Sequence, residues 1–384
     1  MDDAEFTADA PGKLVKILEG VLAFVPNPLP PQISIEHETA DTLAESARAI
    51  GELKGIGSKL PNPYLLIRPF IRREAVLSSR IEGTIATPEE LVLFEATPSE
   101  LPPRNEIREV ANYVRALEYG LMKLKELPVS HRLIREVHRI LLTDVRGEES
   151  RPGEFRNRQN FIGDPSQTIH EARFVPPPVE AMKAGMDGFE KFLHAKCDLP
   201  FLIRLPLIHY QFEALHPFID GNGRVGRLLI VLLLAEREYL SEPLLYLSAY
   251  LDRNRDAYVN QLLRVSQTGT WIEWIRFFLQ GIIEEAHDAL RRSQRLLDLR
   301  EELRTKVQTR RSSALLPKLV DELLAFPALT IPQARKILGV TYRSAQKNVE
   351  KLVEAGILKE SGMRQRNRVY YAPSIISIIE ADKL

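Results

Sequence analysis

Apolar residues recur at helical spacing along most of this 384-residue chain, and runs with the alternating pattern of β-strands are few. This periodicity limits the fold to a mainly α architecture. It predicts helices over residues 37–51, 69–82, 105–125, 130–142, 179–195, 201–215, 224–238, 254–266 and 271–305. Pro69 near a first turn and Gly83 past a helix end fit the helix at 69–82, and Thr87 with Glu90 predicts a capping box that starts a further helix.

Two regions depart from the pattern of long helices. Within residues 151–178, strand-like runs on both sides of a turn at 163–166 predict a small β-hairpin. From about residue 310, three short helices at 317–326, 331–338 and 342–355 precede strand-like runs at 357–358 and 368–371. This order predicts a winged helix-turn-helix domain, and the tail carries a net charge of about +6.

The predicted winged helix has polar and basic side chains where such a domain meets a partner. They are Tyr342, Arg343, Gln346 and Lys347 on the third helix, and Arg364, Arg366 and Arg368 in the wing. Two interpretations stay open at this point. The surface contacts DNA, or the domain contacts a protein, including a second copy of the chain.

The composition excludes several classes of protein. Lys+Arg and Asp+Glu both number 52, so no global charge favours nucleic acid or a membrane. The single cysteine, Cys197, excludes an internal disulfide framework and fits a reducing compartment. The acidic N-terminus lacks the layout of a signal peptide, and the strongest apolar run, 228–235, is far shorter than the ~20 residues that span a bilayer. We therefore expect a cytoplasmic protein with no membrane partner.

The stretch from His216 to Arg227 gathers groups that suit a nucleotide. Gly221-Asn222-Gly223 tolerates positive φ, so backbone amides can converge on an anion, and the following helix points its positive end at the same place. Arg224 and Arg227 are forked donors for phosphate oxygens. Asp220 is a hard oxygen ligand for Mg²⁺, and His216 can accept a proton from a hydroxyl. These residues predict a nucleotide-phosphate site that is not a P-loop, because Gly-Lys-Ser/Thr is missing.

The same twelve residues, His-Pro-Phe-Ile-Asp-Gly-Asn-Gly-Arg-Val-Gly-Arg, resemble the Fic signature His-Pro-Phe-x-Asp/Glu-Gly-Asn-Gly-Arg-x-x-Arg at every defined position. The resemblance extends from roughly residue 40 to 285. It implies a Fic-fold helical core with a small β-hairpin flap, and an enzyme, a protein adenylyltransferase, that moves AMP from ATP onto a Ser, Thr or Tyr hydroxyl of a target protein. Doc-type relatives, which transfer a phosphate, carry Lys where this chain has Gly223, and the bare glycine favours AMP transfer.

The resemblance also implies roles for single residues. His216 would be the general base, and Asp220 would hold Mg²⁺ on the phosphates of ATP. Phosphate contacts are implied for Gly221, Asn222, Gly223, Arg224, Val225, Gly226 and Arg227, with Arg227 on the γ-phosphate. Tyr250 and Asn254 would lie beside the adenine and ribose, and the hairpin flap would hold the target segment by backbone pairing.

A second motif, from Ser78 to Gly83, resembles the inhibitory motif of this family, Ser/Thr-x-x-x-Glu-Gly/Asn. Ser78 and Glu82 lie four residues apart on one helix face. A glutamate in the last turn of a helix needs a cation partner against the negative end of the dipole, and Arg227 is the candidate. The implied enzyme is inhibited in cis by a Glu82–Arg227 pair, and in some relatives the same glutamate helps to remove AMP.

We expect an N-terminal helical region with the inhibitory helix at about 69–83 (residues 1–120), a Fic core (121–285), a linking helix (286–310) and the winged helix-turn-helix domain (311–384). Two alternative functions stay open. One is an ATP-sensing DNA-binding regulator with a non-catalytic Fic core, and the other is an enzyme of this fold that uses another donor or runs mainly in reverse. The resemblance also leaves a homodimer open.

Overall fold

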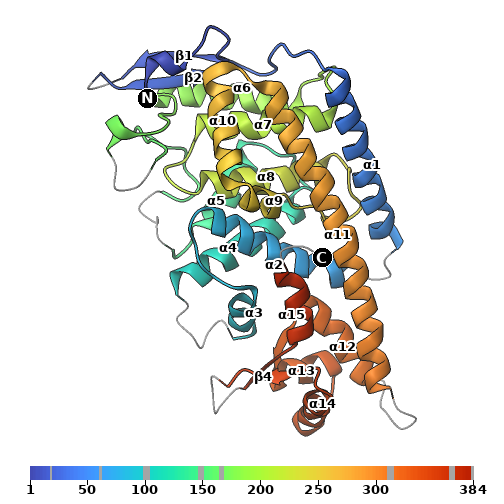
Figure 1. The fold of residues 1–384 in the computed structure, drawn as a ribbon. Helices are drawn as coiled ribbons and strands as arrows, with labels where there is room; N and C mark the ends of the chain where they lie inside the picture. Colours follow the sequence, from blue (N-terminus) through green and yellow to red (C-terminus); the bar gives the residue numbers. More distant parts are fainter. Residues whose placement is uncertain are drawn as a thin grey trace. The chain divides into compact units, whose positions relative to one another are not determined.

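Helices dominate the structure, a computed structural model, as the periodicity predicted (Figure 1). It describes residues 1–17, 20–59, 63–97, 104–145, 151–163, 168–308, 315–362 and 368–381. The chain divides into two units that are each discontinuous in sequence. The first unit consists of Met1–Gly51, Arg115–Tyr239 and Tyr250–Glu284, and the second of Glu52–Val114, Leu240–Ala249 and Glu285–Leu384.

This division into compact units differs from the expected domain boundaries. The predicted N-terminal region, 1–120, is split, because residues 1–51 belong to the first unit and residues 52–114 to the second. The predicted linking helix at 286–310 is not separate, since one continuous helix, α11 (Trp271–Val307), runs through it. Packing between segments far apart in sequence decides these boundaries, and the helical period of each segment does not reveal that packing.

Two buried helices form the centre of the first unit. In α7 (Phe201–Leu215) every residue from Leu202 onward is buried, and in α8 (Asn222–Glu236) burial is continuous from Arg224 to Leu234. Around them lie α5 (His131–Leu141), α6 (Val179–His194), α10 (Arg255–Thr268) and the first part of α11. Helices that are apolar on all sides are core helices of a globular unit, which accounts for the apolar run at 228–235. Three further helices, α1 (His37–Lys59), α4 (Asn105–Lys123) and α9 (Ser248–Arg253), have residues in both units.

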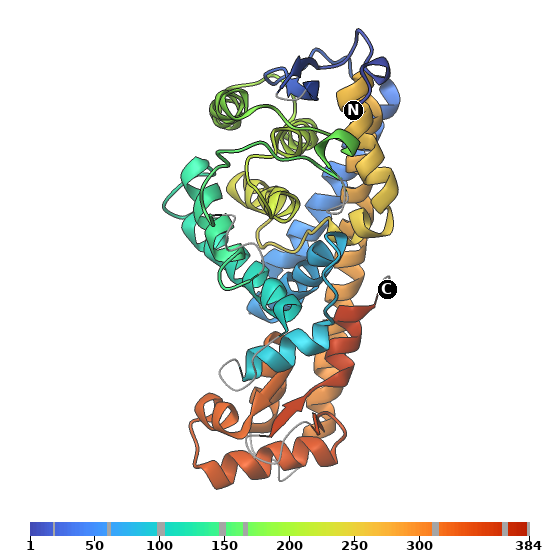
Figure 2. The ribbon, with the colours of Figure 1, turned by 90° about the vertical axis from the view of Figure 1, so that its left-hand side faces the viewer.

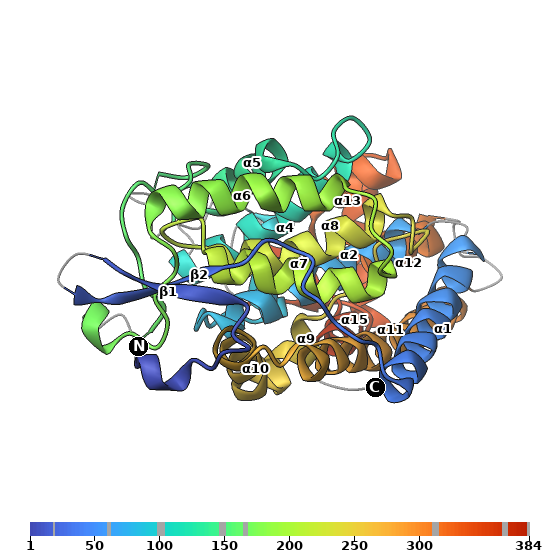
Figure 3. The same ribbon diagram turned by 90° about the horizontal axis from the view of Figure 1, so that it is seen from above.

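Two hairpin-like features occur in the first unit. The strands β1 (Gly12–Lys16) and β2 (Leu22–Pro26) pair antiparallel, with Gly12 opposite Pro26, in a hairpin that the sequence analysis did not predict (Figure 3). The predicted flap is present as one antiparallel bridge, in which Ile162 and Phe174 exchange two backbone hydrogen bonds of 2.8 and 3.2 Å. Its return arm contains a 3₁₀ turn at Ile169–Glu171. Most of its predicted turn, residues 164–167, lies outside the described residues.

The second unit combines the predicted inhibitory helix with the C-terminal elements (Figure 2). It contains α2 (Tyr64–Ile81), α3 (Pro88–Ala96), α12 (Leu315–Ala325), β3 (Ala328–Thr330), α13 (Ile331–Leu338), α14 (Tyr342–Glu354), β4 (Lys359–Glu360), β5 (Val369–Tyr371) and α15 (Pro373–Glu380). The strands form an antiparallel sheet in the order β3-β5-β4. The three helices and two strands expected after residue 310 are present, but β3 is an additional strand between α12 and α13, and β4 begins two residues later than predicted. The wing residues Arg364 and Arg366 lie outside the described residues.

Helix α2 differs from its prediction at one end only. It begins at Tyr64, so Pro69 lies inside the helix instead of at its first turn. The expected end is confirmed, because Ile81 is the last helical residue and Gly83 adopts a positive φ of 87°. The capping box at the start of α3 is also confirmed: Glu90 N–H donates to Thr87 Oγ1 at 3.1 Å, and Thr87 N–H donates to Glu90 Oε2 at 2.9 Å.

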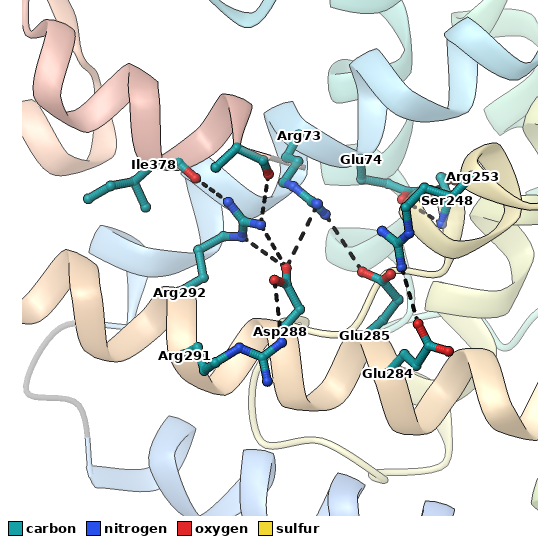
Figure 4. A network of polar contacts seen from close by, with 11 residues as sticks. Arg73, Glu74, Ser248, Arg253, Glu284, Glu285, Asp288, Arg291, Arg292 and Ile378 are labelled. Atoms are coloured by element: carbon teal, nitrogen blue, oxygen red, sulfur yellow. Dashed lines mark hydrogen bonds and ion pairs between the residues drawn. The ribbon is translucent and has the colours of Figure 1, made fainter. Parts of the chain in front are cut away.

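Buried ion pairs and hydrogen bonds join α2 to the C-terminal elements of its unit (Figure 4). Arg73 of α2 lies 3.7 Å from Glu285 and 3.8 Å from Asp288 of α11. Asp288 also accepts from Arg292, whose guanidinium donates to the backbone oxygens of Ile378 and Ala381 at the end of α15. Removal of a single partner from such a network leaves a buried charge unpaired, which is costly.

Within the ranges that the structure describes, no helix combines the length and the apolar character needed to cross a membrane.

Candidate active site

His216 lies at the point where α7 ends. It is the C-cap of α7, in a left-handed conformation with φ 46° and ψ 61°. Its N–H still donates to the Phe212 oxygen of the helix at 3.0 Å. A non-glycine residue in this region costs on the order of 1–3 kcal/mol, and it persists only where the surroundings hold it. Strain of this kind at a half-buried histidine marks His216 as a residue whose position matters.

One contact of the His216 ring favours one of its tautomers. The Nδ1 atom lies 3.3 Å from the backbone oxygen of Glu213. Because a carbonyl oxygen can only accept a hydrogen bond, Nδ1 carries the proton in this contact. The lone pair of the neutral imidazole is then on Nε2. His216 is thus prepared to act as a base through Nε2.

The turn from the loop into α8 is made by Gly221 and Asn222. Gly221 is the N-cap and has a φ of 80°, while Asn222 and Gly223 already belong to the first turn of α8. The helix therefore starts two residues before the predicted position. The Asn222 side chain closes the turn, since Phe218 N–H donates to its Oδ1 at 2.8 Å and its Nδ2 donates to the Phe218 oxygen at 2.9 Å. The amides of the first turn have no acceptor within a helix and lie at its positive end, an arrangement that suits an anion.

Asp220 offers a carboxylate at the rim of this turn. Its side chain is 47% exposed, and its Oδ1 accepts from Gly221 N–H at 2.6 Å and lies 3.7 Å from Arg224 Nη2. Among the described residues, no group of three or more His, Cys, Asp or Glu side chains could hold a metal ion by itself. A single exposed carboxylate suits Mg²⁺, which usually keeps several waters and shares the phosphate oxygens of a nucleotide.

The remaining loop residues divide into two kinds. The side chains of Arg224 and Arg227 are buried along the first two turns of α8. Val225 is fully buried, and its N–H donates to the Gly221 oxygen at 3.0 Å. A Cβ on Gly226 would lie 2.2 Å from Glu213 Oε1, so this glycine allows α7 and α8 to approach closely. Val225 and Gly226 therefore pack in the core of the unit, and their expected contact with phosphate stays a prediction.

The sequence analysis did not predict the side chains outside this loop that stack on it or hydrogen-bond to it. His138 of α5 stacks on Phe218 with a centroid distance of 3.7 Å, and its Nε2 lies 3.0 Å from the Asp220 oxygen. Asn160 donates from Nδ2 to the Phe218 oxygen at 2.9 Å. Both residues lie at least 56 positions from the loop, and no motif covers them, so the sequence carried no signal for this role.

Tyr250 lies in α9 and Asn254 directly follows that helix, and their expected contacts with adenine and ribose stay a prediction. The Tyr250 ring packs on Phe277 at 5.0 Å and is only 7% exposed, and burial raises the pKa of its hydroxyl to about 12. Its packing leaves little of the ring open to a stacked base. Asn254 is the N-cap position of α10, and its Nδ2 donates to the Tyr250 oxygen at 2.9 Å.

The predicted inhibitory residues belong to the second unit, whereas Arg227 belongs to the first. Ser78 is fully buried in the last turns of α2, and Glu82 is the exposed C-cap of that helix. The Glu82 N–H donates to the Ser79 oxygen at 3.1 Å. The motif thus occupies the end of a helix, as its spacing predicted.

Comparison with known proteins identifies the family. Residues 40–122 match the model of the Fic/DOC family N-terminal region, and residues 128–234 match that of the Fic/DOC family. The chain is 32% identical over 138 residues to a protein adenylyltransferase Fic of Drosophila willistoni and 30% identical to that of Drosophila melanogaster. These matches cover 35% of this chain and 26% of each relative, so the chain spans about a quarter of the length of those relatives.

Solved structures support the same fold. A Fic family protein from Desulfovibrio desulfuricans aligns with 90% of this chain and 98% of its own at a TM-score of 0.58 and 20% identity. Fic-1 from C. elegans aligns with 69% of this chain and 74% of its own at a TM-score of 0.51 and 18% identity. With the family matches that include the loop from His216 to Arg227, these similarities establish that the chain belongs to the Fic/DOC family and has the Fic fold.

Proposed function

We propose that this chain transfers AMP from ATP to a hydroxyl group of a target protein. In this reaction the hydroxyl oxygen attacks the α-phosphorus, the bond from that phosphorus to the bridging oxygen breaks, and pyrophosphate leaves. The hydroxyl proton passes to Nε2 of His216. The observation that carries the proposal is the contact of His216 Nδ1 with the Glu213 oxygen, because it leaves Nε2 as the basic nitrogen in the loop that leads into α8. The adenylyltransferase names of the relatives support the same reaction.

The nucleotide would bind at the start of α8. The first-turn amides and the positive end of the helix attract phosphate, and the guanidinium groups of Arg224 and Arg227 add charge there. Asp220 would hold the Mg²⁺ that accompanies ATP, and this ion would neutralise phosphate charge. The hairpin segment that contains Ile162 and Phe174 would hold the target by strand pairing.

We further propose that Glu82 restrains this activity by pairing with Arg227, which would withhold that arginine from the γ-phosphate. Removal of AMP by the same site is a second activity that this arrangement would allow. The face of α14 that carries Tyr342, Arg343 and Gln346 is exposed, and this supports contact of the proposed winged helix with DNA or protein.

Intact-mass measurement after incubation with ATP and Mg²⁺ tests the proposal. We expect Glu82→Gly to gain the mass of AMP on itself or on added protein, wild type to gain far less, and the double variant Glu82→Gly with His216→Ala to gain none. Loss of one general base lowers the rate by roughly 10²–10⁴-fold. Transfer that persists in the double variant would contradict the role of His216. ATP binding without transfer in Glu82→Gly would favour an ATP-sensing regulator.

A further inference from the structure

One buried arginine contacts the end of α7 from outside the signature loop. Arg156 is 1% exposed. Its Nε donates to the His216 oxygen at 2.9 Å, and its Nη2 donates to the oxygens of Pro177 and, at 3.5 Å, Leu215. Its backbone N–H donates to the Pro217 oxygen at 2.8 Å. A single residue thereby binds three consecutive residues of the chain as it leaves α7.

The charge of Arg156 is compatible with this environment. The carbonyl oxygens of Leu215 and His216 lie at the C-terminal, negative end of α7, where a cation is stabilised. Burial lowers the pKa of the Arg156 guanidinium to about 10, so it remains protonated at neutral pH. The planar guanidinium donates in several fixed directions at once, and an ammonium group cannot reproduce that geometry.

Arg156 also connects the catalytic loop to the base of the proposed flap. Pro177 and Arg158, whose backbone oxygens accept from the guanidinium, lie on the two sides of the segment that contains the bridge between Ile162 and Phe174. The position of the flap base and the position of the His216 backbone are therefore set by the same side chain.

We infer that Arg156 is the positioning residue that holds His216 in its left-handed conformation and keeps it in register with the segment that presents the target hydroxyl. This inference rests on the proposed transfer of AMP. Without Arg156, the backbone at His216 can relax to a less strained conformation, and Nε2 moves away from the hydroxyl. The start of α8 keeps contacts that do not involve Arg156, namely the Asn222–Phe218 pair and the His138–Asp220 contact. Loss of Arg156 therefore lowers kcat and changes the KM for ATP little.

The test compares two buried arginines in the Glu82→Gly background. Arg156→Gln removes the loop contact, and Arg204→Gln is the matched control. Arg204 is also buried and donates to a backbone oxygen, that of Phe192 at 2.7 Å, but it lies near the first turn of α7, away from the loop. Initial rates at varied ATP should show kcat lower by about 10–100-fold in Arg156→Gln, as for an ångström-scale misplacement of a catalytic group. The KM for ATP should stay within about threefold.

Two further measurements separate positioning from general damage. Arg156→Lys keeps the positive charge but not the planar guanidinium, so its kcat should lie between those of Arg156→Gln and the parent protein. Hydrogen exchange of the amides at 213–222 should be faster in Arg156→Gln and unchanged in Arg204→Gln. An unchanged kcat in Arg156→Gln, or an equal loss in Arg204→Gln, overturns the inference. If Glu82→Gly itself transfers no AMP, the proposed function fails, and the exchange measurement still decides whether Arg156 holds the loop.

Discussion

Side chains from outside the signature loop contact it, and the contacts of one of them, His138, depend on the protonation state of its ring. The Nδ1 atom of His138 accepts a hydrogen bond from Gly153 N–H at 2.8 Å, and its Nε2 lies 3.0 Å from the Asp220 backbone oxygen. Because Nδ1 accepts, Nε2 carries the proton and donates to Asp220. A doubly protonated ring could not accept at Nδ1. Burial lowers the pKa of His138 to about 4, so the neutral form persists well below neutral pH.

This pKa predicts acid sensitivity at the loop. Between about pH 6.5 and pH 4 the unfolded chain binds a proton at His138 and the folded chain does not, so the free energy of unfolding decreases as the pH falls through this window. By pH 4.5 the His138 share of the decrease is roughly 2–3 kcal/mol. His138→Gln, which retains one donor and one acceptor, should show a smaller decrease in urea unfolding between pH 7 and pH 4.5.

Surface His194→Gln serves as the control for that measurement, since it removes a histidine from the exposed side of α6. His209, whose pKa burial lowers to about 3, contributes equally in all three proteins. Identical decreases in wild type and His138→Gln would contradict the prediction.

The proximity of the proposed site residues was predictable from sequence because these residues are contiguous. His216, Asp220 and Arg224 lie within one loop and one helical turn, so their proximity follows from covalent geometry alone. The contacts that hold this loop from outside were not predictable, because Arg156 and His138 lie 60 and 82 positions along the sequence from the loop residues that they contact. The local pattern around them contains nothing that fixes such contacts.

Elements with a long apolar period were predicted well, and several short ones were missed. The bounds of α7 and α13 coincide with the predicted ranges 201–215 and 331–338. The β1–β2 hairpin was missed because its five-residue strands give little alternation and depend on packing: Phe24 N–H donates to the Val175 oxygen, and Phe24 packs on Phe174. Helix α9, of six residues, and α15, of eight, were not predicted. Helix α13 is as short as α15 but has a capping box at Thr330 and Gly339 at its end, whereas α15 has no side-chain cap.

The packing of α6 on α7 gives a test at the level of elements. Two glycines of α6 lie one turn apart in different surroundings. A Cβ on Gly185 would lie 2.4 Å from Leu215 Cδ2, while a Cβ on Gly188 would have no atom within 4 Å. Gly185→Ala should therefore lower the free energy of unfolding by about 1–3 kcal/mol through overpacking. Gly188→Ala should raise it by about 0.5–1 kcal/mol. Urea unfolding of both variants tests this, and equal effects would contradict the described approach of α6 to Leu215.

At the scale of the whole molecule, the second unit is assembled from three separate segments of sequence. Its stability must therefore rest on contacts between those segments. Arg72 of α2 shows this, because it donates to the Ala325 oxygen of α12 at 2.9 Å and to Glu95 of α3 at 2.6 Å. The predicted inhibitory helix is thus held by the C-terminal elements, which explains why domain boundaries inferred from local pattern placed it elsewhere.

The ion pairs around Asp288 provide the test at this scale. Arg292 is 1% exposed and donates to Asp288 and to the end of α15, whereas Arg291 reaches the same carboxylate at 3.8 Å with a half-exposed side chain. Arg292→Leu leaves buried backbone oxygens and part of a buried charge unpaired, so it should lower the free energy of unfolding by about 3–5 kcal/mol. Arg291→Leu should change it by less than about 1 kcal/mol. Urea unfolding of both variants measures the difference. Because Asp288 loses one arginine in each case, similar effects would mean that the junction of α11 with α15 does not hold the second unit together.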